Sequence, residues 1–232
     1  MRTGVRRRVC GRARRRAGSR APVTEWIVVV PVKGSDLSKT RLAELPATVA
    51  ERRRLALAFA LDTVEALRAA AGVVEVLVVT GDPESADALS RLGASTLADP
   101  GGGLNAALTS GIAEARRRRP AAAVAAITAD LPAVTPRAIE AALALAAEHP
   151  RSFVPDAEGT GTTTIAALPG VDLTPRFGVG SALAHAESGM IALPVPSDSP
   201  LRRDVDTPAD LAVDADSFGA HTRAELQRGR TR

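Results

Sequence analysis

Apolar runs alternate with segments of helical periodicity along most of this chain. An apolar run of about four to eight residues indicates a buried strand, whereas apolar residues that recur with the helical period indicate a helix packed on a core. Strands that alternate with helices are typical of a mostly parallel sheet covered by crossover helices. The sequence therefore predicts an α/β fold.

The same alternation predicts the bounds of each element. Strands are expected at residues 26–32, 73–80, 94–97, 121–128, 152–155, 162–168 and 190–195. Helices are expected at residues 48–71, 83–92, 104–118, 136–149, 181–188 and 211–215. The helix starts carry capping signals, namely Thr48 with Glu51, Thr135 before Pro136, and Thr207 with Asp210. The two strands around the Gly/Thr-rich turn at 159–161 are expected to pair in antiparallel orientation.

A length of 232 residues fits one α/β domain. We expect that domain to span residues 23–215. Residues 1–22 are expected to form a disordered, Arg-rich extension, and residues 216–232 a flexible C-terminal tail, because the tail is polar and short of core residues. The sequence leaves the oligomeric state open.

The basic character of the chain lies in its first twenty residues, which hold nine arginines and no acid. Since the formal net charge is +4, the remainder carries about −5. The extension could be a nucleic-acid-binding arm, a targeting segment, or an addition that belongs to the gene model. We favour the last, because Val23 directly precedes the first strand and valine codons can include an alternative start. With an aromatic content of only 2%, we expect no nucleic-acid partner.

Membrane association is not expected, because the longest apolar runs are far too short to span a bilayer. The one cysteine, Cys10, cannot form an internal disulfide, which agrees with a soluble, cytoplasmic protein. His149, His185 and His221 are scattered, and we expect each at the surface or at a helix end. Any metal chemistry should therefore use oxygen ligands.

Lysine is confined to one loop directly after the first predicted strand. Of the thirty Lys and Arg residues, only Lys33 and Lys39 are lysines, and Arg41 follows them. The lysine ammonium group is a compact charge on a flexible stem, which suits it to follow a phosphate oxygen through a reaction. Chance placement in a solvated loop is the alternative. The pattern favours a loop that handles phosphate.

Ligands of open α/β sheets bind beyond the carboxyl ends of the strands. The glycine run at residues 101–103 follows one predicted strand and opens a helix. Its free backbone amides, at Gly102 and Gly103, could meet an anion or the edge of a purine. A flexible loop before a helix is the alternative for this segment.

Acidic residues supply candidate metal ligands at the same edge. Asp130 directly follows a buried strand and precedes Leu131 and Pro132, so it is either a metal ligand or a loop or capping carboxylate. Asp204 and Asp206 are two residues apart, and in an extended segment both side chains point the same way. Mg²⁺ usually takes one or two carboxylates and completes its shell with water and phosphate.

Hydroxyl-bearing residues and glycines form a third cluster. The segments are Gly159-Thr-Gly-Thr-Thr-Thr164 and Phe177-Gly-Val-Gly-Ser-Ala182. Hydroxyls and backbone amides at a helix N-terminus can hold a phosphate or a carboxylate, although a β-turn and a Ser-capped helix would give the same pattern. Together, the three clusters indicate an enzyme that acts on two phosphate-bearing substrates.

Several short motifs follow one another along residues 26–215. They are Pro31-Val-Lys33, Ser38-Lys-Thr-Arg-Leu42, Gly103-Leu-Asn105, Thr128-Ala-Asp-Leu-Pro132, Gly161-Thr-Thr163, Phe177-Gly-Val-Gly-Ser181 and Asp204-Val-Asp-Thr-Pro208. Jointly they resemble the guanylyltransferases of the deazaflavin coenzyme F-420 pathway, which act on 2-phospho-L-lactate or phosphoenolpyruvate. The resemblance implies a single-domain, Rossmann-related nucleotidyltransferase fold, a three-layer sandwich around a mixed, mostly parallel sheet. Molybdenum-cofactor and sugar-phosphate nucleotidyltransferases differ by a Gly-Gly or Gly-x-Gly loop after the first strand.

The resemblance also implies a reaction in which GMP passes from GTP to the phosphate of the acceptor acid, with release of pyrophosphate. Lys33, Lys39 and Arg41 would hold the triphosphate and neutralise the departing pyrophosphate. Mg²⁺ on Asp130 and on Asp206 or Asp204 would orient in-line attack. The implied nucleotide-binding residues are Gly102, Gly103 and Asn105, near the guanine, and the implied acceptor-binding residues are Thr163, Gly178 and Ser181.

The acceptor is expected to be phosphoenolpyruvate. The Arg- and Ala-rich composition resembles that of high-GC actinobacteria, whose members of this family are associated with phosphoenolpyruvate, whereas archaeal members are associated with 2-phospho-L-lactate. Two alternatives stay open. The chain could be another NTP-dependent nucleotidyltransferase, of the molybdopterin or sugar-phosphate type, or a nucleotide-binding regulator without turnover.

Overall fold

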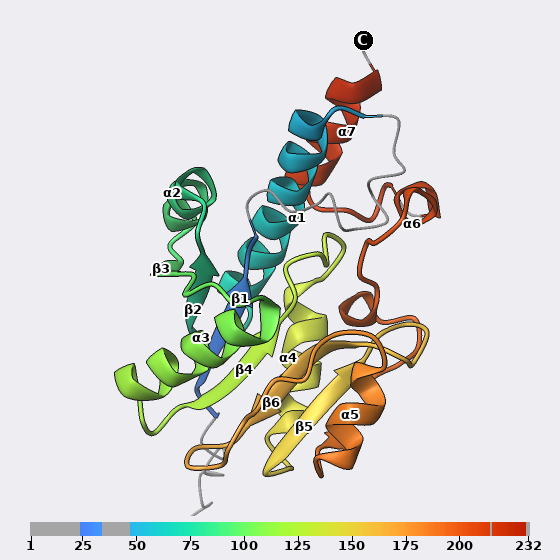
Figure 1. Ribbon diagram of the computed structural model, residues 1–232. Coiled ribbons are helices and arrows are strands. Elements are labelled where there is room, and N and C mark those ends of the chain that lie inside the picture. The colour runs from blue at the N-terminus through green and yellow to red at the C-terminus, as the bar shows by residue number, and fades with distance from the viewer. Residues whose placement is uncertain (1–23, 34–46, 214, 231–232) are drawn as a thin grey trace, which may run out of the picture.

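A seven-stranded sheet forms the centre of the described part of the chain, which in this computed structural model comprises residues 24–33, 47–213 and 215–230 (Figure 1). The strands are β1 (Trp26–Pro31), β2 (Val73–Thr80), β3 (Ser95–Ala98), β4 (Ala123–Ile127), β5 (Arg151–Pro155), β6 (Thr162–Ala167) and β7 (Ile191–Ala192). They lie in the order β3-β2-β1-β4-β6-β5-β7.

Strands β1 to β4 are parallel to one another, and β6 runs antiparallel to both β4 and β5. The prediction of a mixed, mostly parallel sheet is therefore confirmed. Since parallel strands end at the same edge, the carboxyl ends of β1 to β4 lie together. The start of β6 lies there as well, because Thr164 is paired with Ile127 at the end of β4.

Helices cover both faces of the sheet and make a three-layer sandwich (Figure 1). One face packs against α1 (Val49–Ala69), α2 (Pro83–Arg91) and α4 (Pro136–Ala146). The other packs against α3 (Leu104–Arg118) and α5 (Ser181–Glu187). The C-terminal part adds the 3₁₀ helix η3 (Pro200–Arg202), α6 (Pro208–Val213) and α7 (Ala220–Arg230).

The predicted capping signals form as expected. Thr48 and Glu51 make a reciprocal capping box at the start of α1. Thr207 and Asp210 make the same exchange at the start of α6, with Thr207 N–H to Asp210 Oδ2 at 2.7 Å. Because proline is tolerated in the first helical turn, α6 begins at Pro208, earlier than the predicted start at residue 211.

Gly111 lets α3 lie close against the sheet. A Cβ at this position would collide with the side chains of Val29 on β1 and Val79 on β2. We therefore expect Gly111→Ala to lower the free energy of unfolding by about 1–3 kcal/mol, the cost of overpacking a dense core, measured by urea denaturation. Gly229→Ala in α7 is the matched control, because open space surrounds that glycine, and it should leave stability unchanged or slightly higher. Equal losses in both variants would contradict the packing argument.

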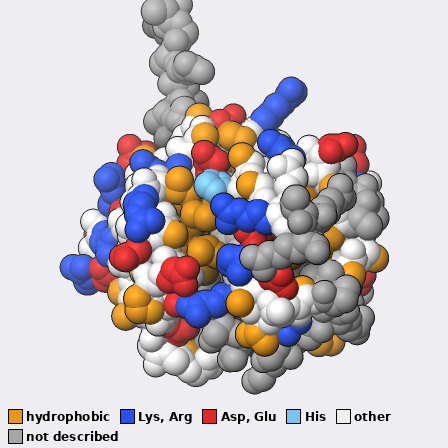
Figure 2. Space-filling model, turned by 90° about the horizontal axis from the view of Figure 1, so that it is seen from above, with side chains coloured by type: hydrophobic (Ala, Val, Ile, Leu, Met, Phe, Trp, Pro, Cys, Tyr) orange, Lys and Arg blue, Asp and Glu red, His pale blue; other side chains and the backbone are white. Residues whose placement is uncertain are grey.

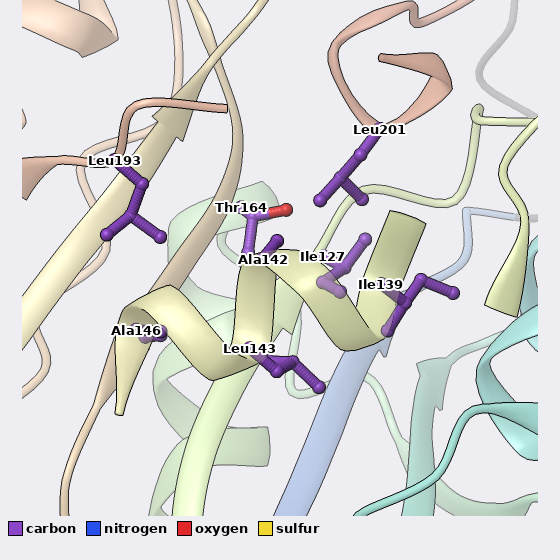
Figure 3. Close-up of a pocket in the computed structure, with 9 residues that line it drawn as sticks. Ile127, Ile139, Ala142, Leu143, Ala146, Thr164, Leu193 and Leu201 are labelled. Atoms are coloured by element: carbon purple, nitrogen blue, oxygen red, sulfur yellow. The ribbon is translucent and has the colours of Figure 1, made fainter. Parts of the chain in front are cut away.

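A small cavity of about 10 Å³ lies between the sheet, α4 and η3 (Figure 3). Of its described lining residues only Thr164 is polar, and the buried Thr164 hydroxyl has no hydrogen-bond partner among the residues that the structure describes. Removing an unpaired buried hydroxyl while keeping the side-chain shape should stabilise the fold, so Thr164→Val is expected to raise Tm by about 2–4 °C. Thr162→Val is the control, because the Thr162 hydroxyl is paired with His185, and it should lower Tm. A fall in both would show that Thr164 also has a partner.

The sequence predicts a strand at residues 190–195, but β7 covers only Ile191–Ala192. The rest of that prediction is wrong. Pro194 and Pro196 have no N–H to donate to a strand ladder. The chain nevertheless continues beside the sheet, because the Leu193 N–H donates to the Phe153 carbonyl at 2.9 Å. Leu193 and Val195 are buried, which accounts for the apolar pattern.

The C-terminal segment differs most from expectation, because residues predicted as a flexible tail form α7 and pack along α1 (Figure 1). Phe218 is 3% exposed, and the N–H groups of His221 and Thr222 donate to the carboxylate of Asp62 on α1. The helix is amphipathic only weakly, so the reason for its order lies in contacts with distant residues. Local sequence carries little sign of them.

The predictions for residues 1–22, including Cys10, lie outside the described residues. Among the helices of the described part, none combines the length and apolar character needed to cross a membrane. On the face seen in Figure 2, the described basic and acidic side chains are interspersed with hydrophobic ones. On this face the described residues therefore form no continuous basic surface of the kind that follows a nucleic-acid backbone.

Candidate active site

The predicted site residues that the structure describes gather at the edge where β1 to β4 end. Lys33 follows β1, the glycine run follows β3, and Asp130 follows β4. At this edge the Thr128 N–H donates to the Thr163 carbonyl at 3.0 Å, which brings the start of β6 beside the end of β4. Segments distant in sequence thus meet in one place, as expected for a ligand site of an open α/β sheet.

Three aspartates converge just beyond β4. The Val205 N–H donates to the Asp130 carbonyl at 3.0 Å, which holds the segment between η3 and α6 against the loop after β4. As a result, carboxylate oxygens of Asp130, Asp204 and Asp206 all lie within 4.8 Å of one another. The sequence left open which of Asp204 and Asp206 joins Asp130, and the structure brings both there.

Crowding of negative charge changes the acidity of this trio. Burial, followed by the charge of Asp206, raises the pKa of Asp130 to about 6. Burial, followed by the charges of Asp130 and Asp206, raises the pKa of Asp204 to about 7. Both shifts mean that the charged forms are destabilised without a compensating cation.

The donor set fits a hard divalent cation. All three groups offer carboxylate oxygens, and Asp130 Oδ1 is buried without a hydrogen-bond partner among the described residues. The alternative role for Asp130 as a helix cap is wrong, because the side chain of Thr135 caps α4. The three carboxylates instead lie close enough together to share one cation.

A hollow of about 340 Å³ adjoins the trio. Its lining includes Arg203, Asp204, Val205, Ser197 and Phe218. Pockets of about 300–1,000 Å³ are typical of small-molecule sites. Asp204 of the trio therefore borders a space that can accept part of a substrate.

Lys33 is exposed directly after the buried residue Val32, whose N–H donates to the Val79 carbonyl at 2.9 Å. This hydrogen bond keeps the chain paired with β2 one residue beyond the end of β1. Lys39 and Arg41 lie outside the described residues, so their predicted role stays a prediction.

Asn105 joins the glycine loop to a distant segment. Gly102 and Gly103 adopt φ values of 84° and 96°, which glycine tolerates and other residues avoid. In the first turn of α3, the Asn105 amide donates from Nδ2 to the Phe177 carbonyl at 3.0 Å and accepts at Oδ1 from the Phe177 N–H at 2.8 Å. Both polar groups of this side chain thus bind protein, which makes Asn105 a link between two loops.

The predicted acceptor-binding residues occupy two different settings. Thr163 is completely buried in β6, and its hydroxyl donates to the Leu201 carbonyl at 2.7 Å. Gly178 is exposed with φ 135°, and its carbonyl accepts from the N–H of Ser181, the first residue of α5. The Asn105 link places the Gly178–Ser181 turn beside the glycine loop, whereas Thr163 lies beside β4.

His185 was expected at the surface or at a helix end, and the structure shows it completely buried in the last turn of α5. The Arg176 N–H donates to His185 Nε2 at 3.0 Å, and His185 Nδ1 lies 2.9 Å from the Thr162 hydroxyl. Since Nε2 accepts, the neutral ring carries its proton on Nδ1. Phe153 and Phe177 pack around the ring. The neighbours of His185 on the same helix face are Ser181, Ala182 and Ser188, so the local sequence carries no clear signal of this burial.

The pKa of His185 falls to about 4, mainly through burial and then through the positive charge of Arg176. In the unfolded chain the pKa should be about 6.5, so between these values only the unfolded state takes up the proton. Stability should therefore fall as the pH decreases from about 6.5 to about 4. Between pH 7 and pH 5 we expect a loss of about 2 kcal/mol from this residue, measured by urea denaturation.

Asp130 and Asp204 should instead make the protein more stable as the pH falls, because their raised pKa values let the folded state take up protons first. The difference in stability between the parent and His185→Gln does not contain the contribution of Asp130 and Asp204, since both proteins keep these carboxylates. The variant should lack the loss assigned to His185. An identical pH dependence in both proteins would show that His185 takes up its proton at the same pH in the folded and unfolded states.

Asp156 is a nearby acid that the sequence did not single out. Its carboxylate accepts from the N–H groups of Thr160 and Gly161 in the β5–β6 turn. Its charge also contributes to the raised pKa of Asp204, after burial and the two other aspartates. Arg202 donates to the carbonyls of Pro155 and Asp156, which fixes this turn against η3.

Sequence comparisons point to one group of proteins. A family model described as the MobA-like NTP transferase domain matches residues 56–176. A phosphoenolpyruvate guanylyltransferase of Streptomyces avermitilis is 47% identical over 206 residues, which cover 88% of this chain and 95% of that protein. A protein of the same name from Thermomonospora curvata is 50% identical over 187 residues, 80% of this chain and 81% of that protein.

Comparison with solved structures supports the same fold. A nucleotidyl transferase from Methanothermobacter thermautotroptrophicus superposes with a TM-score of 0.53 at 20% identity. The superposition covers 90% of this chain and 99% of that one. At this level of identity the likeness concerns the fold alone.

Proposed function

This chain belongs to the phosphoenolpyruvate guanylyltransferase family of MobA-like NTP transferases, and from that membership we propose that it transfers GMP from GTP to the phosphate of phosphoenolpyruvate. The family resemblance expected from the motifs is confirmed, and so is its nucleotidyltransferase fold. The reaction would be a step of deazaflavin coenzyme F-420 biosynthesis. The observation that carries the proposal is the convergence of Asp130, Asp204 and Asp206 beside a hollow at the ligand-binding edge of the sheet.

The chemistry needs positioning and charge neutralisation. A phosphate oxygen of phosphoenolpyruvate forms a bond to the α-phosphorus of GTP, while the bond from that phosphorus to the bridging oxygen breaks and pyrophosphate leaves. A substrate phosphate is already an anion at neutral pH, so no general base is required. Buried His185 accordingly takes no part as a base.

We assign the divalent ion, Mg²⁺, to Asp130, Asp204 and Asp206. When bound, the ion supplies charge neutralisation at the phosphates and a fixed orientation for in-line attack. The protein contributes three oxygen donors, whose mutual repulsion the ion would relieve. Lys33, with Lys39 and Arg41, would neutralise the triphosphate, since all three follow β1 within ten residues of its end at Pro31.

The remaining assignments concern the two organic groups. The backbone amides of Gly102 and Gly103 would approach the nucleotide, because glycines have no side chains to block the approach and tolerate the positive φ values of this loop. The turn from Gly178 to Ser181 would hold the acceptor acid. For Thr163 we propose that the backbone, and not the hydroxyl, contacts the acceptor acid, since the hydroxyl already donates to the Leu201 carbonyl.

The decisive experiment is incubation of the protein with GTP, Mg²⁺ and phosphoenolpyruvate, with pyrophosphate release and product mass as readouts. We expect one pyrophosphate per guanylylated phosphoenolpyruvate, and a smaller rate with 2-phospho-L-lactate. Equal release with CTP would exclude a guanylyl-specific enzyme. GTP binding without pyrophosphate release with either acid would instead support a regulator without turnover.

A further inference from the structure

Helix α7 forms where the sequence predicts a flexible C-terminal tail, and the turn before it lies near the aspartate trio. We propose that the turn at Phe218 and Gly219, held by α7, positions the aspartates for the divalent ion. Phe218 and Gly219 are positioning residues in this proposal, because neither offers a ligand. The inference rests on the ion site of the proposed function, but it depends on neither the nucleotide nor the acceptor acid.

The start of α7 is fixed by one buried carboxylate. Asp62 on α1 is 4% exposed and accepts from the His221 N–H at 3.0 Å and the Thr222 N–H at 2.8 Å. These amides belong to the first turn of the helix, where a carboxylate is favoured by hydrogen bonding and by the helix dipole. A Cβ at Gly219 would collide with Asp62, so glycine permits the close approach. The turn before α7 thus has a defined position on α1.

That turn reaches the loop that carries Asp130. The Gly219 N–H donates to the Pro132 carbonyl at 2.8 Å, two residues beyond Asp130. Pro132 is buried, and as a proline it has restricted backbone freedom. The contact therefore restrains the loop on one side of the trio.

The same turn reaches the segment that carries the other two aspartates. Val205, between Asp204 and Asp206, is 4% exposed and belongs to a hydrophobic cluster with Phe218. The other members of that cluster are Leu55, Phe59 and Leu211. Phe218 and Val205 also line the hollow beside the trio. Loss of the Phe218 ring would leave the Asp204–Asp206 segment less restrained.

Both halves of the metal site therefore depend on two adjacent residues. Three like charges within 4.8 Å repel one another and would move apart if their supports were loosened. Groups that orient metal ligands typically change metal affinity by about 10–100-fold when they are replaced. We expect the Phe218 turn to act in this range.

The test measures Mn²⁺ binding to the full chain by the EPR signal of free Mn²⁺, without substrates. Phe218→Ala should weaken binding about tenfold or more. In the guanylyl transfer assay the same variant should need a correspondingly higher Mg²⁺ concentration, with kcat recovered at saturating Mg²⁺. Phe218→Leu, which keeps an apolar side chain, should restore most of the affinity. Because Mn²⁺ binding needs no turnover, its result stands even if guanylyl transfer is not detected.

Glu225→Gln is the matched control. Glu225 pairs with Arg54 at 2.7 Å and so contributes to the contact between α1 and α7 away from the turn. Its replacement should change Mn²⁺ affinity less than about twofold, as expected for a surface pair. If Phe218→Ala does not fold, Gly219→Ala, whose Cβ would displace the turn from Asp62, takes its place. Unchanged Mn²⁺ affinity in the folded variant, or an equal loss in Glu225→Gln, would overturn the proposal.

Discussion

Asp130→Asn is expected to lower kcat/KM for guanylyl transfer by at least about 100-fold, the equivalent of about 2.7 kcal/mol of transition-state stabilisation. The carboxylate lies just beyond β4 and has a buried oxygen with no hydrogen-bond partner in the part of the chain that the structure describes. An amide at this position keeps the shape but removes the negative charge that a divalent cation requires. Added Mg²⁺ should restore only part of the rate.

The same substitution should stabilise the protein in the absence of metal. Burial and the charge of Asp206 already raise the pKa of Asp130 to about 6, so removal of this charge relieves repulsion. We expect Asp130→Asn to melt at a higher temperature than the parent in EDTA, and to lose the rise in Tm that Mg²⁺ gives the parent.

Asp172→Asn provides the control, since Asp172 is exposed and pairs only at 3.4 Å with Arg116 on the surface. Neither its turnover nor its response to Mg²⁺ should change. Undiminished turnover in Asp130→Asn would remove Asp130 from the metal site. Lower stability of that variant in EDTA would contradict the repulsion argument.

The central sheet and the helix starts could be predicted because their signals are local. The run from Trp26 to Pro31 is apolar at every position and forms a strand buried throughout. The capping pair of Thr48 and Glu51 is encoded within four residues and forms in the structure as the sequence predicts. In these cases the interacting groups lie within one turn or one strand.

Helix α7 could not be predicted by the same means. The residue that caps it, Asp62, lies 159 residues before His221 in the chain. Val205, which clusters with Phe218 just before the helix, also belongs to another segment. The burial of His185 has a similar origin, because Thr162 and Arg176 supply its hydrogen bonds from outside α5. Contacts of this kind exist only once the fold brings distant residues together.

The candidate site lies between these extremes. The sequence identified Asp130, Asp204 and Asp206 by residue type and position, since carboxylates after strands are typical ligands of hard cations. It could not show that Asp204 and Asp206 both lie beside Asp130, because this placement depends on the hydrogen bond from the Val205 N–H to the Asp130 carbonyl. Asn105 was assigned to the nucleotide by resemblance, whereas its side chain contacts Phe177.

Asn105→Ala is expected to lower kcat/KM by about 10–100-fold, because it removes both hydrogen bonds that hold Phe177 beside the glycine loop. Phe177 directly precedes Gly178, so the loss should let the proposed acceptor-binding turn move away from the nucleotide. We expect KM for phosphoenolpyruvate to rise more than KM for GTP, measured by initial rates with each substrate varied. Mn²⁺ affinity should stay unchanged, since the aspartate trio is held by other contacts.

Asn105→Asp sharpens the test, because a carboxylate still accepts from the Phe177 N–H but repels the Phe177 carbonyl. The loss of kcat/KM in Asn105→Asp should approach that in Asn105→Ala. Thr109→Ala is the control on the same helix, since the Thr109 hydroxyl donates only to the Asn105 carbonyl within α3. A higher KM for GTP alone in Asn105→Ala would instead mean that Asn105 serves the nucleotide, and the link to Phe177 would then have no part in acceptor binding.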